Sequence, residues 1–357
     1  MTDVAERSRR ARAALEAADA AIVAALDARA RALRQLAELR ALDPEGWSGP
    51  PRDADVIAAA ESAAREMPRE LVRGVFREVL GASRRLIAPL RVLYVGPEGG
   101  LGHAAAIRHF GRAAELVAVE SVTALLDGVR RADEVQGLLP IETSTEGTVA
   151  ATLEGLLAAD LSIVGEITLA ASWDLVSATG NASDVDKVYG TASAIAACER
   201  QVRAAFPRVT LLDVPTGALA AAMARDDHGA AALVPSVLSG EVDLRTVRAS
   251  VEDVAGASIR YVVVGRQGPA RTGADRTWIA FAVQDSPGAF YRALRPFADR
   301  DVNLTRVESR PSRGTAWRYV FFVELDGHAS DRPVLGALDE LRGVTRFVKV
   351  LGSYPRP

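Results

Sequence analysis

The first 90 residues of the chain place apolar positions at helical spacing. Intervals of three or four residues separate Leu15, Ala18, Ile22 and Leu26. This is the spacing of one face of an amphipathic helix, and we predict a very long first helix over residues 4–42. The segment DPEGWSGPP ends it, because its turn-forming residues cannot continue a helix. Two further helices are predicted, one after a cap at Asp53 and one over residues 69–87, with no strand among them.

From residue 90 the pattern changes to short apolar runs bounded by glycine and proline. The predicted strands include RVLYVG, LVAVES, VQGLLPIE, SIVGEITLA, RVTLLDV and RYVVVG. The helical stretches between them include AAAIRHFGRAA, TALLDGVRRA, ASAIAACERQVRAAF and TGALAAAMA. Alternation of strand and helix is typical of a doubly wound α/β domain, which we place at residues 91–266. The polar segment RQGPARTGADR that follows is predicted to be a linker.

Residues 276–357 show a third pattern, which contains two helices and four strands. The order is strand (TWIAFAV), helix (GAFYRALRPFAD), strand (NLTRVES), strand (RYVFFVEL), helix (RPVLGALDEL) and strand (TRFVKVLG). A βαββαβ order within about 80 residues is the ferredoxin-like split motif. The chain is therefore predicted to have three domains, at residues 1–90, 91–266 and 276–357.

Composition narrows the function classes. Forty-three basic residues against 46 acidic ones give a net charge of -3 over 357 residues, which excludes nucleic-acid binding through bulk charge. Cys198 is the single cysteine, so no internal disulfide forms. No apolar run is long enough for a membrane span, and the N-terminus lacks the apolar core of a signal peptide. We expect a cytoplasmic protein without nucleic-acid or membrane partners.

Lysine is almost absent from the chain. Only Lys187 and Lys349 are lysines among the 43 basic residues. We interpret this first as coding bias. Any pocket that binds a carboxylate will nevertheless carry guanidinium groups.

The loop GPEGGLGH, Gly96–His103, follows a predicted strand and opens a helix. Backbone N–H groups and the helix dipole at such a place can hold an anion. The run Gly100–Ala105 also fits a G-x-G-x-x-A dinucleotide fingerprint, with Glu120 ending the next strand where a ribose ligand would lie. Against a dinucleotide, Glu98 would bring a carboxylate close to a pyrophosphate. An anion site, a dinucleotide site and a purely structural turn all remain open.

A second polar loop, LPIETSTEG, lies between a predicted strand and a helix expected to start near Gly147. It presents four polar side chains, those of Glu142, Thr143, Ser144 and Thr145. Hydroxyls beside a free helix N-terminus suit a small carboxylated or hydroxylated ligand. The alternative is a cap cluster in which Thr145 satisfies the first N–H groups of the helix.

Metal and nucleophile chemistry find no support in the sequence. Neither HExxH nor a Cys/His ligand spacing occurs around the four histidines, His103, His109, His228 and His328. No G-x-S-x-G elbow is present. Cys198 lies in a helical run and is interpreted as a buried structural thiol. We expect neither a metal nor a cofactor.

Taken together, the three segments resemble the bifunctional chorismate mutase/prephenate dehydratase family with a C-terminal ACT domain. The most specific match is NLTRVESRP, Asn303–Pro311, paired with the Gly-Ala-Phe run at 288–290; these resemble the family's ESRP and GALV motifs. The segments GPEGGLGHAA, LPIETSTEG, FREVLGASRRL and FVKVLGSYP also resemble family motifs. The resemblance covers essentially the whole chain.

The resemblance implies a multidomain architecture. The first domain would be an all-α chorismate-mutase-like unit that forms an intertwined dimer. The second would be an α/β prephenate dehydratase domain of two periplasmic-binding-protein-like lobes. The third would be an α+β ferredoxin-like ACT domain, and the assembly would be a homodimer or homotetramer.

The mutase reaction is pericyclic and needs cations that hold two carboxylates, together with donors to the ether oxygen. Family pocket positions fall on Arg12, Arg29, Arg40, Asp53 and Ser83. The family's Arg-Glu pair falls on Val56 and Ile57, and its glutamine on Ile87. Because three polar positions have become aliphatic, we hypothesise that this domain is chiefly a dimerising scaffold with weak or lost mutase activity.

The dehydratase domain departs from its family at the catalytic motif. The family's Thr-Arg-Phe corresponds here to Ile259, Arg260 and Tyr261, so the threonine that assists the departing hydroxide is missing. Arg260, Ser258 and Thr143 are the candidate catalytic residues. The expected substrate-binding set comprises Gly96, Glu98, His103, Glu142, Ser144, Thr145, Gly147, Thr191, Ser193 and Ile259.

Three outcomes are compatible with this change. The chain is a prephenate dehydratase in which Ser258, Thr143 or Thr191 takes over as donor; this has the family behind it. Alternatively it acts on prephenate or a related cyclohexadiene without aromatising it, for example as a decarboxylase. Finally, it is a catalytically silent sensor of aromatic amino acids.

The C-terminal segment departs least from its family, whose ACT domains bind phenylalanine between paired copies and inhibit the enzyme. The residues expected at this allosteric site are Gly288, Ala289, Asn303, Leu304, Glu308, Ser309 and Arg310. The alternative is that Glu308 and Arg310 make only local salt bridges.

Overall fold

The computed structural model describes residues 2–42, 53–86, 90–132, 134–311 and 319–356. The chain divides into two compact units. The first comprises Met1–Leu90 and His109–Glu115, and the second Arg91–Arg108 and Leu116–Pro357. Among the described residues, none of the helices combines the length and the apolar character that a membrane crossing requires.

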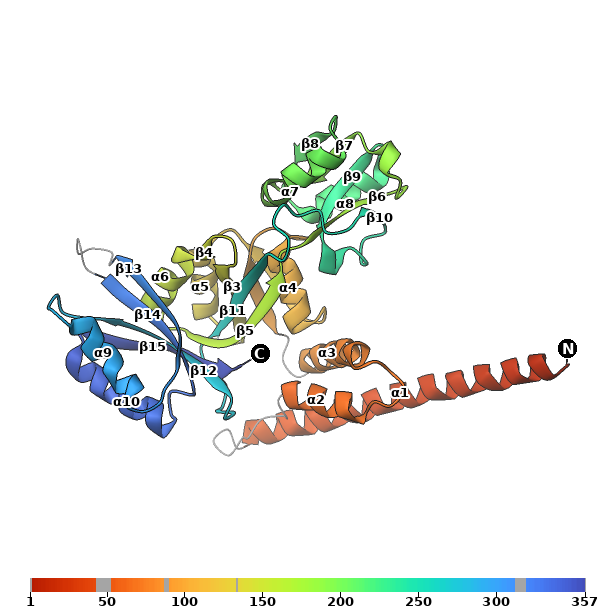
Figure 1. Cartoon of the computed structure of the whole chain (residues 1–357). Coiled ribbons are helices and arrows are strands. Elements are labelled where there is room, and N and C mark those ends of the chain that lie inside the picture. The colour runs from red at the N-terminus through yellow and green to blue at the C-terminus, as the bar shows by residue number, and fades with distance from the viewer. Residues whose placement is uncertain (1, 43–52, 87–89, 133, 312–318, 357) are drawn as a thin grey trace. The chain divides into compact units, whose positions relative to one another are not determined.

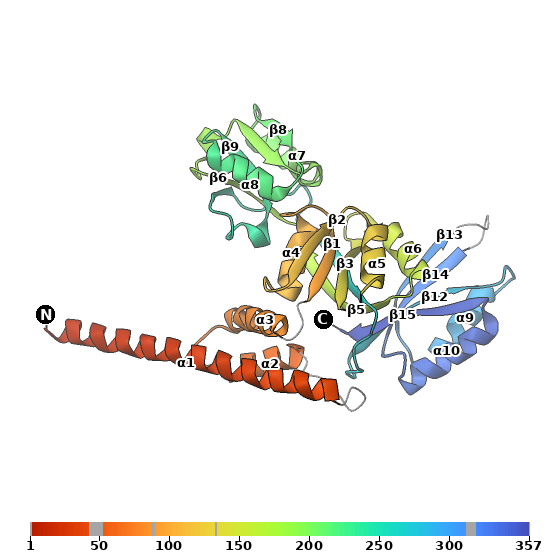
Figure 2. The ribbon, with the colours of Figure 1, turned by 180° about the vertical axis from the view of Figure 1, so that it is seen from behind.

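The first unit is helical, as predicted. It contains α1 (Thr2–Leu42), α2 (Asp53–Ala63) and α3 (Arg69–Arg85). The helices α2 and α3 pack together beside the C-terminal half of α1 (Figure 2). Along α1 the side chain of Leu33 is buried, whereas Leu15 and Ile22 remain 64% and 58% exposed. The predicted end of the third helix, at Ile87, lies outside the described residues.

The second unit begins with a mixed sheet, which we call the first lobe. Its strand order is β2-β1-β3-β11-β5, with β4 paired to β3. The strands are β1 (Arg91–Val95), β2 (Glu115–Val119), β3 (Val135–Thr143), β4 (Gly147–Thr148), β5 (Ser162–Ala170) and β11 (Ser258–Gly265). The helices are α4 (Leu101–Phe110), α5 (Val122–Arg130) and α6 (Ala150–Ala158). Strand β11 runs antiparallel to both β3 and β5, so its start lies beside the end of β3.

Between β5 and β11 the chain builds a second lobe around a five-stranded sheet of order β10-β6-β9-β7-β8. Its strands are β6 (Trp173–Ser177), β7 (Lys187–Gly190), β8 (Thr210–Asp213), β9 (Ala230–Pro235) and β10 (Arg245–Arg248). Its α-helices are α7 (Ala192–Ala205) and α8 (Gly217–Asp226), with single 3-10 turns at Ala182–Asp184 and Ser236–Leu238. The two-lobed expectation is confirmed. Of these strands the sequence predicted only β8.

The ferredoxin-like order predicted for the C-terminal segment is confirmed. It comprises β12 (Asp275–Ala282), α9 (Ala289–Ala298), β13 (Leu304–Pro311), β14 (Tyr319–Asp326), α10 (Arg332–Val344) and β15 (Phe347–Pro355). The sheet order is β13-β14-β12-β15, and α9 and α10 lie on one of its faces (Figure 1). Buried Phe281, Phe297 and Leu341 belong to the core between helices and sheet.

The other face of this sheet packs against the first lobe in one continuous apolar cluster. Trp278, Phe322 and Tyr354 of the C-terminal sheet share it with Leu139 and others of the first lobe. At the edge of the cluster, Gly352 on β15 lies so close to the backbone of β5 that any side chain there would overlap it. The C-terminal sheet is therefore docked on the lobe that carries β3 and β11.

Candidate functional site

The loop between β1 and α4 is fixed to the second lobe by backbone contacts. The N–H of Gly217, at the start of α8, donates to the carbonyl of Glu98 at 2.9 Å. Gly99 has a φ of +75°, and a Cβ on it would lie 2.6 Å from the nitrogen of Ala218. The glycines thus allow the backbone of this loop to lie close to the backbone of the second lobe, and not to a pyrophosphate. This favours the structural or small-anion interpretation of the loop over the dinucleotide one.

His103 lies in the first turn of α4 and faces this loop. Its Nδ1 accepts a hydrogen bond from the N–H of Gly99 at 3.1 Å, and its ring stacks on Tyr94 with centroids 5.3 Å apart. Burial, followed by the nearby charge of Glu98, raises the pKa of Tyr94 to about 12. Tyr94 is therefore a neutral support for His103 at physiological pH.

The polar loop after β3 is a hairpin, β3–β4, rather than a helix cap. Thr143 Oγ1 accepts from the N–H of Glu146 at 2.9 Å and so closes the hairpin turn. Gly147, with a φ of +78°, begins β4. The helix expected near Gly147 begins at Ala150, and its N-cap Val149 has no side-chain cap. The interpretation of Thr145 as the cap is therefore wrong; the residue is exposed in the hairpin turn.

Ser144 and Ser258 hold the end of β3 against the start of β11. The N–H of Ser144 donates to the carbonyl of Ser258, and the N–H of Ser258 donates to Ser144 Oγ, both at 2.9 Å. In the next register positions Thr143 faces Ile259 and Glu142 faces Arg260. The structure thus brings together six candidates from two distant segments.

Ile259 and Arg260 project to opposite faces of the sheet, because side chains alternate along a strand. Ile259 is half-buried and packs against the apolar cluster of the second lobe, which also receives Leu101 and Ile195. The guanidinium of Arg260 instead forms ion pairs with Glu166 on β5 and Glu324 on β14. Arg260 is thereby separated from the face on which Ile259 lies.

The surroundings of Arg260 form a buried ion network between the first lobe and the C-terminal sheet. Arg260 Nη2 lies 2.5 Å from Glu324 Oε2, and Arg276 Nη1 lies 3.0 Å from Glu166 Oε1. The hydroxyl of Tyr354 donates to Glu166 at 2.8 Å. Burial alone would lower the pKa of Arg260, but Glu166 and Glu324 outweigh it and raise the pKa. The guanidinium is therefore permanently charged and is engaged by two carboxylates.

The second lobe contributes Thr191 and Ser193 at the start of α7. Thr191 is the N-cap, and its Oγ1 accepts from the N–H of Ala194 at 3.3 Å. Its hydroxyl also lies 3.1 Å from Ser193 Oγ. Ile195, one turn along α7, packs against the same apolar cluster as Ile259. These hydroxyls are thus carried by the helix that approaches the start of β11.

In the helical unit, the described candidates differ in their surroundings. Arg29 Nη1 is buried and has no hydrogen-bond partner among the described residues, whereas Arg12 is exposed. Ser83 is buried and donates to the carbonyl of Val79 at 2.5 Å, within its own helix. The side chains of Arg40 and Asp53 lie outside the described residues.

The candidate allosteric residues lie at the two ends of α9 and along β13. Gly288, with a φ of +72°, is the N-cap of α9, and Ala289 is buried after it. Asn303 and Leu304 follow the other end of that helix. On β13, Ser309 is exposed, while Arg310 Nε lies 3.5 Å from Glu308 Oε1. The expected local salt bridge is present, and Arg310 also contacts the β3–β4 hairpin.

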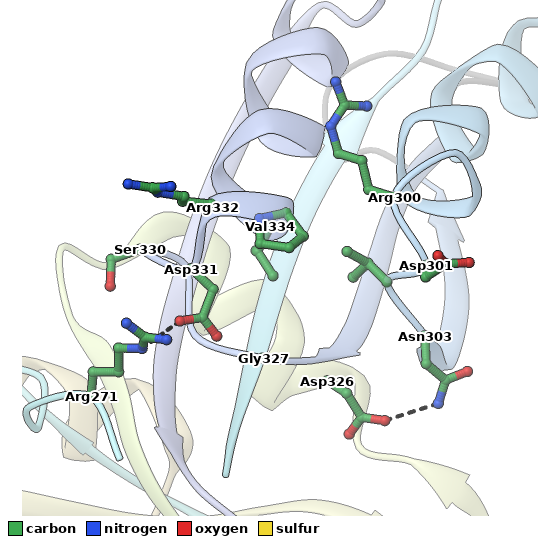
Figure 3. A pocket seen from close by; sticks show the side chains of 12 residues that line it. Arg271, Arg300, Asp301, Asn303, Asp326, Gly327, Ser330, Asp331, Arg332 and Val334 are labelled. Atoms are coloured by element: carbon green, nitrogen blue, oxygen red, sulfur yellow. Dashed lines mark hydrogen bonds and ion pairs between the residues drawn. The ribbon is translucent and has the colours of Figure 1, made fainter. Parts of the chain in front are cut away.

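A pocket of about 740 Å³ opens beside Asn303, between the turn after α9 and the turn before α10 (Figure 3). Asn303 Nδ2 donates to Asp326 at 2.9 Å, and Arg271 Nε lies 2.5 Å from Asp331 (Figure 3). Val334 supplies an apolar patch between these two pairs. The carboxylates of Asp326 and Asp331 in this pocket are thus already engaged by protein side chains.

No metal centre is found in the part of the chain that the structure describes, where no group of three potential ligands occurs. Cys198 is fully buried, and burial raises the pKa of its thiol to about 12. Its interpretation as an inert structural thiol agrees with this.

The sequence patterns did not indicate the residues that connect the C-terminal sheet to the first lobe. They are Glu166, Arg276, Glu324, Arg306, Thr148 and Lys349. The available signal was a charge at an inward position of an otherwise apolar strand, as in SIVGEITLA and YVFFVELD. Such a charge requires a buried partner.

Comparison with known proteins divides the chain into the same three segments. A prephenate dehydratase family model matches residues 92–269, an ACT domain model residues 277–343 and a type II chorismate mutase model residues 11–87. The bifunctional chorismate mutase/prephenate dehydratase of Aquifex aeolicus is 32% identical over 356 residues, covering 98% of each chain. That of Pseudomonas aeruginosa is 33% identical over 291 residues, covering 81% of this chain and 80% of its own.

A solved structure extends the likeness to three dimensions. The prephenate dehydratase of Arthrobacter aurescens in complex with L-Phe aligns with a TM-score of 0.63 at 31% identity, over 74% of this chain and 90% of its own. The three domain models follow the order of the family, and one relative is similar over nearly the full length of the chain. The chain belongs to the bifunctional chorismate mutase/prephenate dehydratase family.

Proposed function

We propose that the chain converts prephenate to phenylpyruvate, carbon dioxide and water, as a carbon–oxygen lyase of phenylalanine biosynthesis. The observation that carries the proposal is the near full-length similarity to bifunctional chorismate mutase/prephenate dehydratases. In this reaction the carboxylate leaves as carbon dioxide, and the electrons of the broken bond aromatise the ring and expel the hydroxyl. A donor that protonates the departing oxygen makes it a better leaving group.

Thr143 is the residue that we assign as this donor. It lies opposite Ile259, the position of the family threonine, across the β3–β11 register. Its Oγ1 accepts from the N–H of Glu146, so the hydroxyl proton is left for another acceptor. Ser258 and Thr191 are the alternatives; Thr191 Oγ1 is already shared with Ala194 and Ser193. We assign Arg260 to the support of β11, because two carboxylates engage its guanidinium.

Incubation of the purified protein with prephenate at neutral pH tests the proposal. Phenylpyruvate is the expected product. A decarboxylated, non-aromatic keto acid would instead assign the chain to the non-aromatising alternative. Unchanged prephenate would assign it to the sensor alternative.

We propose that the helical domain serves chiefly to hold two copies together. The family's Arg-Glu pair is replaced by half-buried Val56 and Ile57, and each lost donor costs about 3 kcal/mol of transition-state stabilisation. Apolar side chains along α1, such as Leu15 and Ile22, are exposed in the single chain and suit a second copy. Efficient conversion of chorismate to prephenate by the purified protein would contradict the weakened pocket.

We propose that phenylalanine is the effector and that it binds between ACT domains of two copies. Gly288 and Asn303 flank α9, whose ten residues separate its ends by about 15 Å. One small amino acid cannot touch both ends within one chain, so a site that uses both needs two copies. Calorimetric titration with phenylalanine tests binding, and absence of both heat and a melting shift would contradict it. We place the protein in the cytoplasm, where the thiol of Cys198 remains reduced.

A further inference from the structure

Strand β13 carries the candidate effector residues and also touches the candidate substrate loop. Arg306 Nη2 donates to Thr148 Oγ1 at 2.6 Å, and Arg306 Nη1 forms an ion pair with Glu142. Arg310 Nη2 donates to the carbonyl of Thr148 at 3.1 Å. Two side chains of one ACT strand thus hold both strands of the β3–β4 hairpin.

The helix that follows the hairpin is held by the same sheet. Lys349 Nζ on β15 donates to the carbonyls of Leu156 at 3.0 Å, Leu157 at 2.9 Å and Ala159 at 2.5 Å. These carbonyls end α6, where a cation is favoured by the helix dipole and by the free acceptors. The segment 142–159 is therefore fixed at its start by β13 and at its end by β15.

The contacts at the hairpin are shielded from solvent. The side chains of Arg306 and Glu142 are 19% and 29% exposed, and Arg260 Nη1 lies 3.9 Å from the same Glu142 oxygen. A partly buried, hydrogen-bonded ion pair is screened less than a surface pair. Removal of Arg306 would leave Glu142 with a single, more distant cation.

Strand β13 presents alternate residues to different surroundings. Arg306 and Arg310 are half-buried against the hairpin, whereas Val307 and Ser309 between them are exposed. A ligand that moves this strand necessarily moves the two guanidinium groups with it. The same strand therefore faces the effector region and the loop that carries Thr143.

We propose that Arg306 and Arg310 are positioning residues through which the ACT domain sets the conformation of the Glu142–Thr148 hairpin. The inference rests on the proposed function for its catalytic consequence. An effector bound at β13 would then change turnover by shifting these two side chains, without contacting the reacting atoms.

The first test requires no catalysis. Hydrogen–deuterium exchange of peptides covering residues 142–149 is compared in the full-length protein and in Arg306→Ala, without effector. We expect exchange about tenfold faster in the variant, because the hairpin loses an ion pair and a hydrogen bond, each tenfold corresponding to about 1.4 kcal/mol. Equal exchange in the two proteins would overturn the proposal.

Two further variants separate positioning from general damage. Thr148→Val keeps the shape and removes only the Oγ1 acceptor, so a smaller increase in the same peptides is expected. Arg342→Ala removes an exposed arginine of α10 paired with Asp339 and should leave these peptides unchanged. An equal increase throughout β6 and β9 in Arg306→Ala would indicate global destabilisation and would contradict a specific role.

The second test measures regulation. In Arg306→Ala we expect the KM for prephenate to rise several-fold more than kcat falls, and inhibition by phenylalanine to weaken at least fivefold. Calorimetric affinity for phenylalanine should stay within twofold of the unchanged chain. Full inhibition of the variant would overturn the inference. A wild-type protein that makes no phenylpyruvate would defeat the proposed function, while the exchange comparison would still decide the inference.

Discussion

Ile259 and Arg260 are sequence neighbours on β11, yet one packs against the second lobe and the other pairs with Glu324 of the ACT domain. The first two positions of the family's Thr-Arg-Phe motif therefore face different parts of the molecule. The position of Ile259 belongs to the face where the lobes meet, and Arg260 belongs to the interface with the ACT sheet. Loss of the threonine can change the chemistry without disturbing the ion network.

Replacement of Ile259 by threonine should increase dehydration. The new hydroxyl would lie beside Thr143, and a positioned donor contributes about 10²- to 10⁴-fold to a proton transfer. We expect kcat for phenylpyruvate formation to rise at least tenfold. Formation of phenylpyruvate from prephenate is followed at neutral pH.

Ile259→Val is the matched control for this change. Valine has the shape of threonine without the hydroxyl, so it reports the effect of reduced volume alone. If Ile259→Thr is no faster than Ile259→Val, the account based on this single position is wrong.

Replacement of Arg260 by methionine should act on stability. The side chains of Glu166 and Glu324 are each at most 3% exposed. After the replacement, Arg276 would be their remaining cation. Breaking a buried pair by removing one partner costs about 3 to 5 kcal/mol. Denaturant unfolding should show this loss, whereas Arg342→Met, at an exposed pair, should show little. A variant of unchanged stability with abolished turnover would instead make Arg260 a catalytic residue.

The elements that could be predicted from the sequence are those whose apolar residues recur with a clear period. The long helix, the ACT order and most of the first lobe follow from apolar spacing alone. Strands such as β9, AAALVP, were missed because alanine-rich runs of six residues have no period that distinguishes strand from helix. Their strand conformation comes from pairing with β6 and β7, which are distant in sequence.

The site was predicted less completely, for a related physical reason. Motifs identified the segments that carry Thr143 and Ile259, and these two residues lie opposite each other across the β3–β11 register. The direction of Arg260 could not be read from a motif, because it depends on the strand register and on Glu324 in another domain. Long-range partners of buried charges are visible only after the sheets are docked.

Asp275 should make the stability of the ACT domain depend on pH. Burial alone would raise the pKa of Asp275, but hydrogen bonds from Thr272 and Gly273 outweigh it and lower the pKa below its usual 3.8. A lowered folded-state pKa contributes stability above the unfolded value, and that stability is lost as pH falls through the folded value.

Asp275→Asn should therefore be less stable than the unchanged chain at pH 7, by about 1 to 3 kcal/mol. The difference should shrink as pH falls below about 4, where the carboxylate of the unfolded chain takes up a proton. Denaturant midpoints measured from pH 7 to pH 3 check this. A constant difference over that range would contradict the role assigned to the charge.

The two lysines should respond differently to replacement by arginine. Lys349 directs its ammonium group at three carbonyls of α6, and its buried position lowers its pKa. A planar guanidinium is larger and cannot direct three N–H groups at acceptors grouped around one point. Lys349→Arg should lower the free energy of unfolding by about 1 to 3 kcal/mol, as expected when buried acceptors lose their donor.

Lys187→Arg provides the comparison, because Lys187 pairs at the surface with the single carboxylate of Asp227 at 2.7 Å. An exposed pair of this kind accepts arginine readily, so denaturant unfolding should be almost unchanged. Equal effects at the two positions would show that the ammonium geometry at α6 is unimportant. A selective effect at Lys349 would explain why a chain that uses arginine for nearly all its cations retains a lysine there: only a compact ammonium group fits the carbonyl end of the helix that follows the candidate substrate loop.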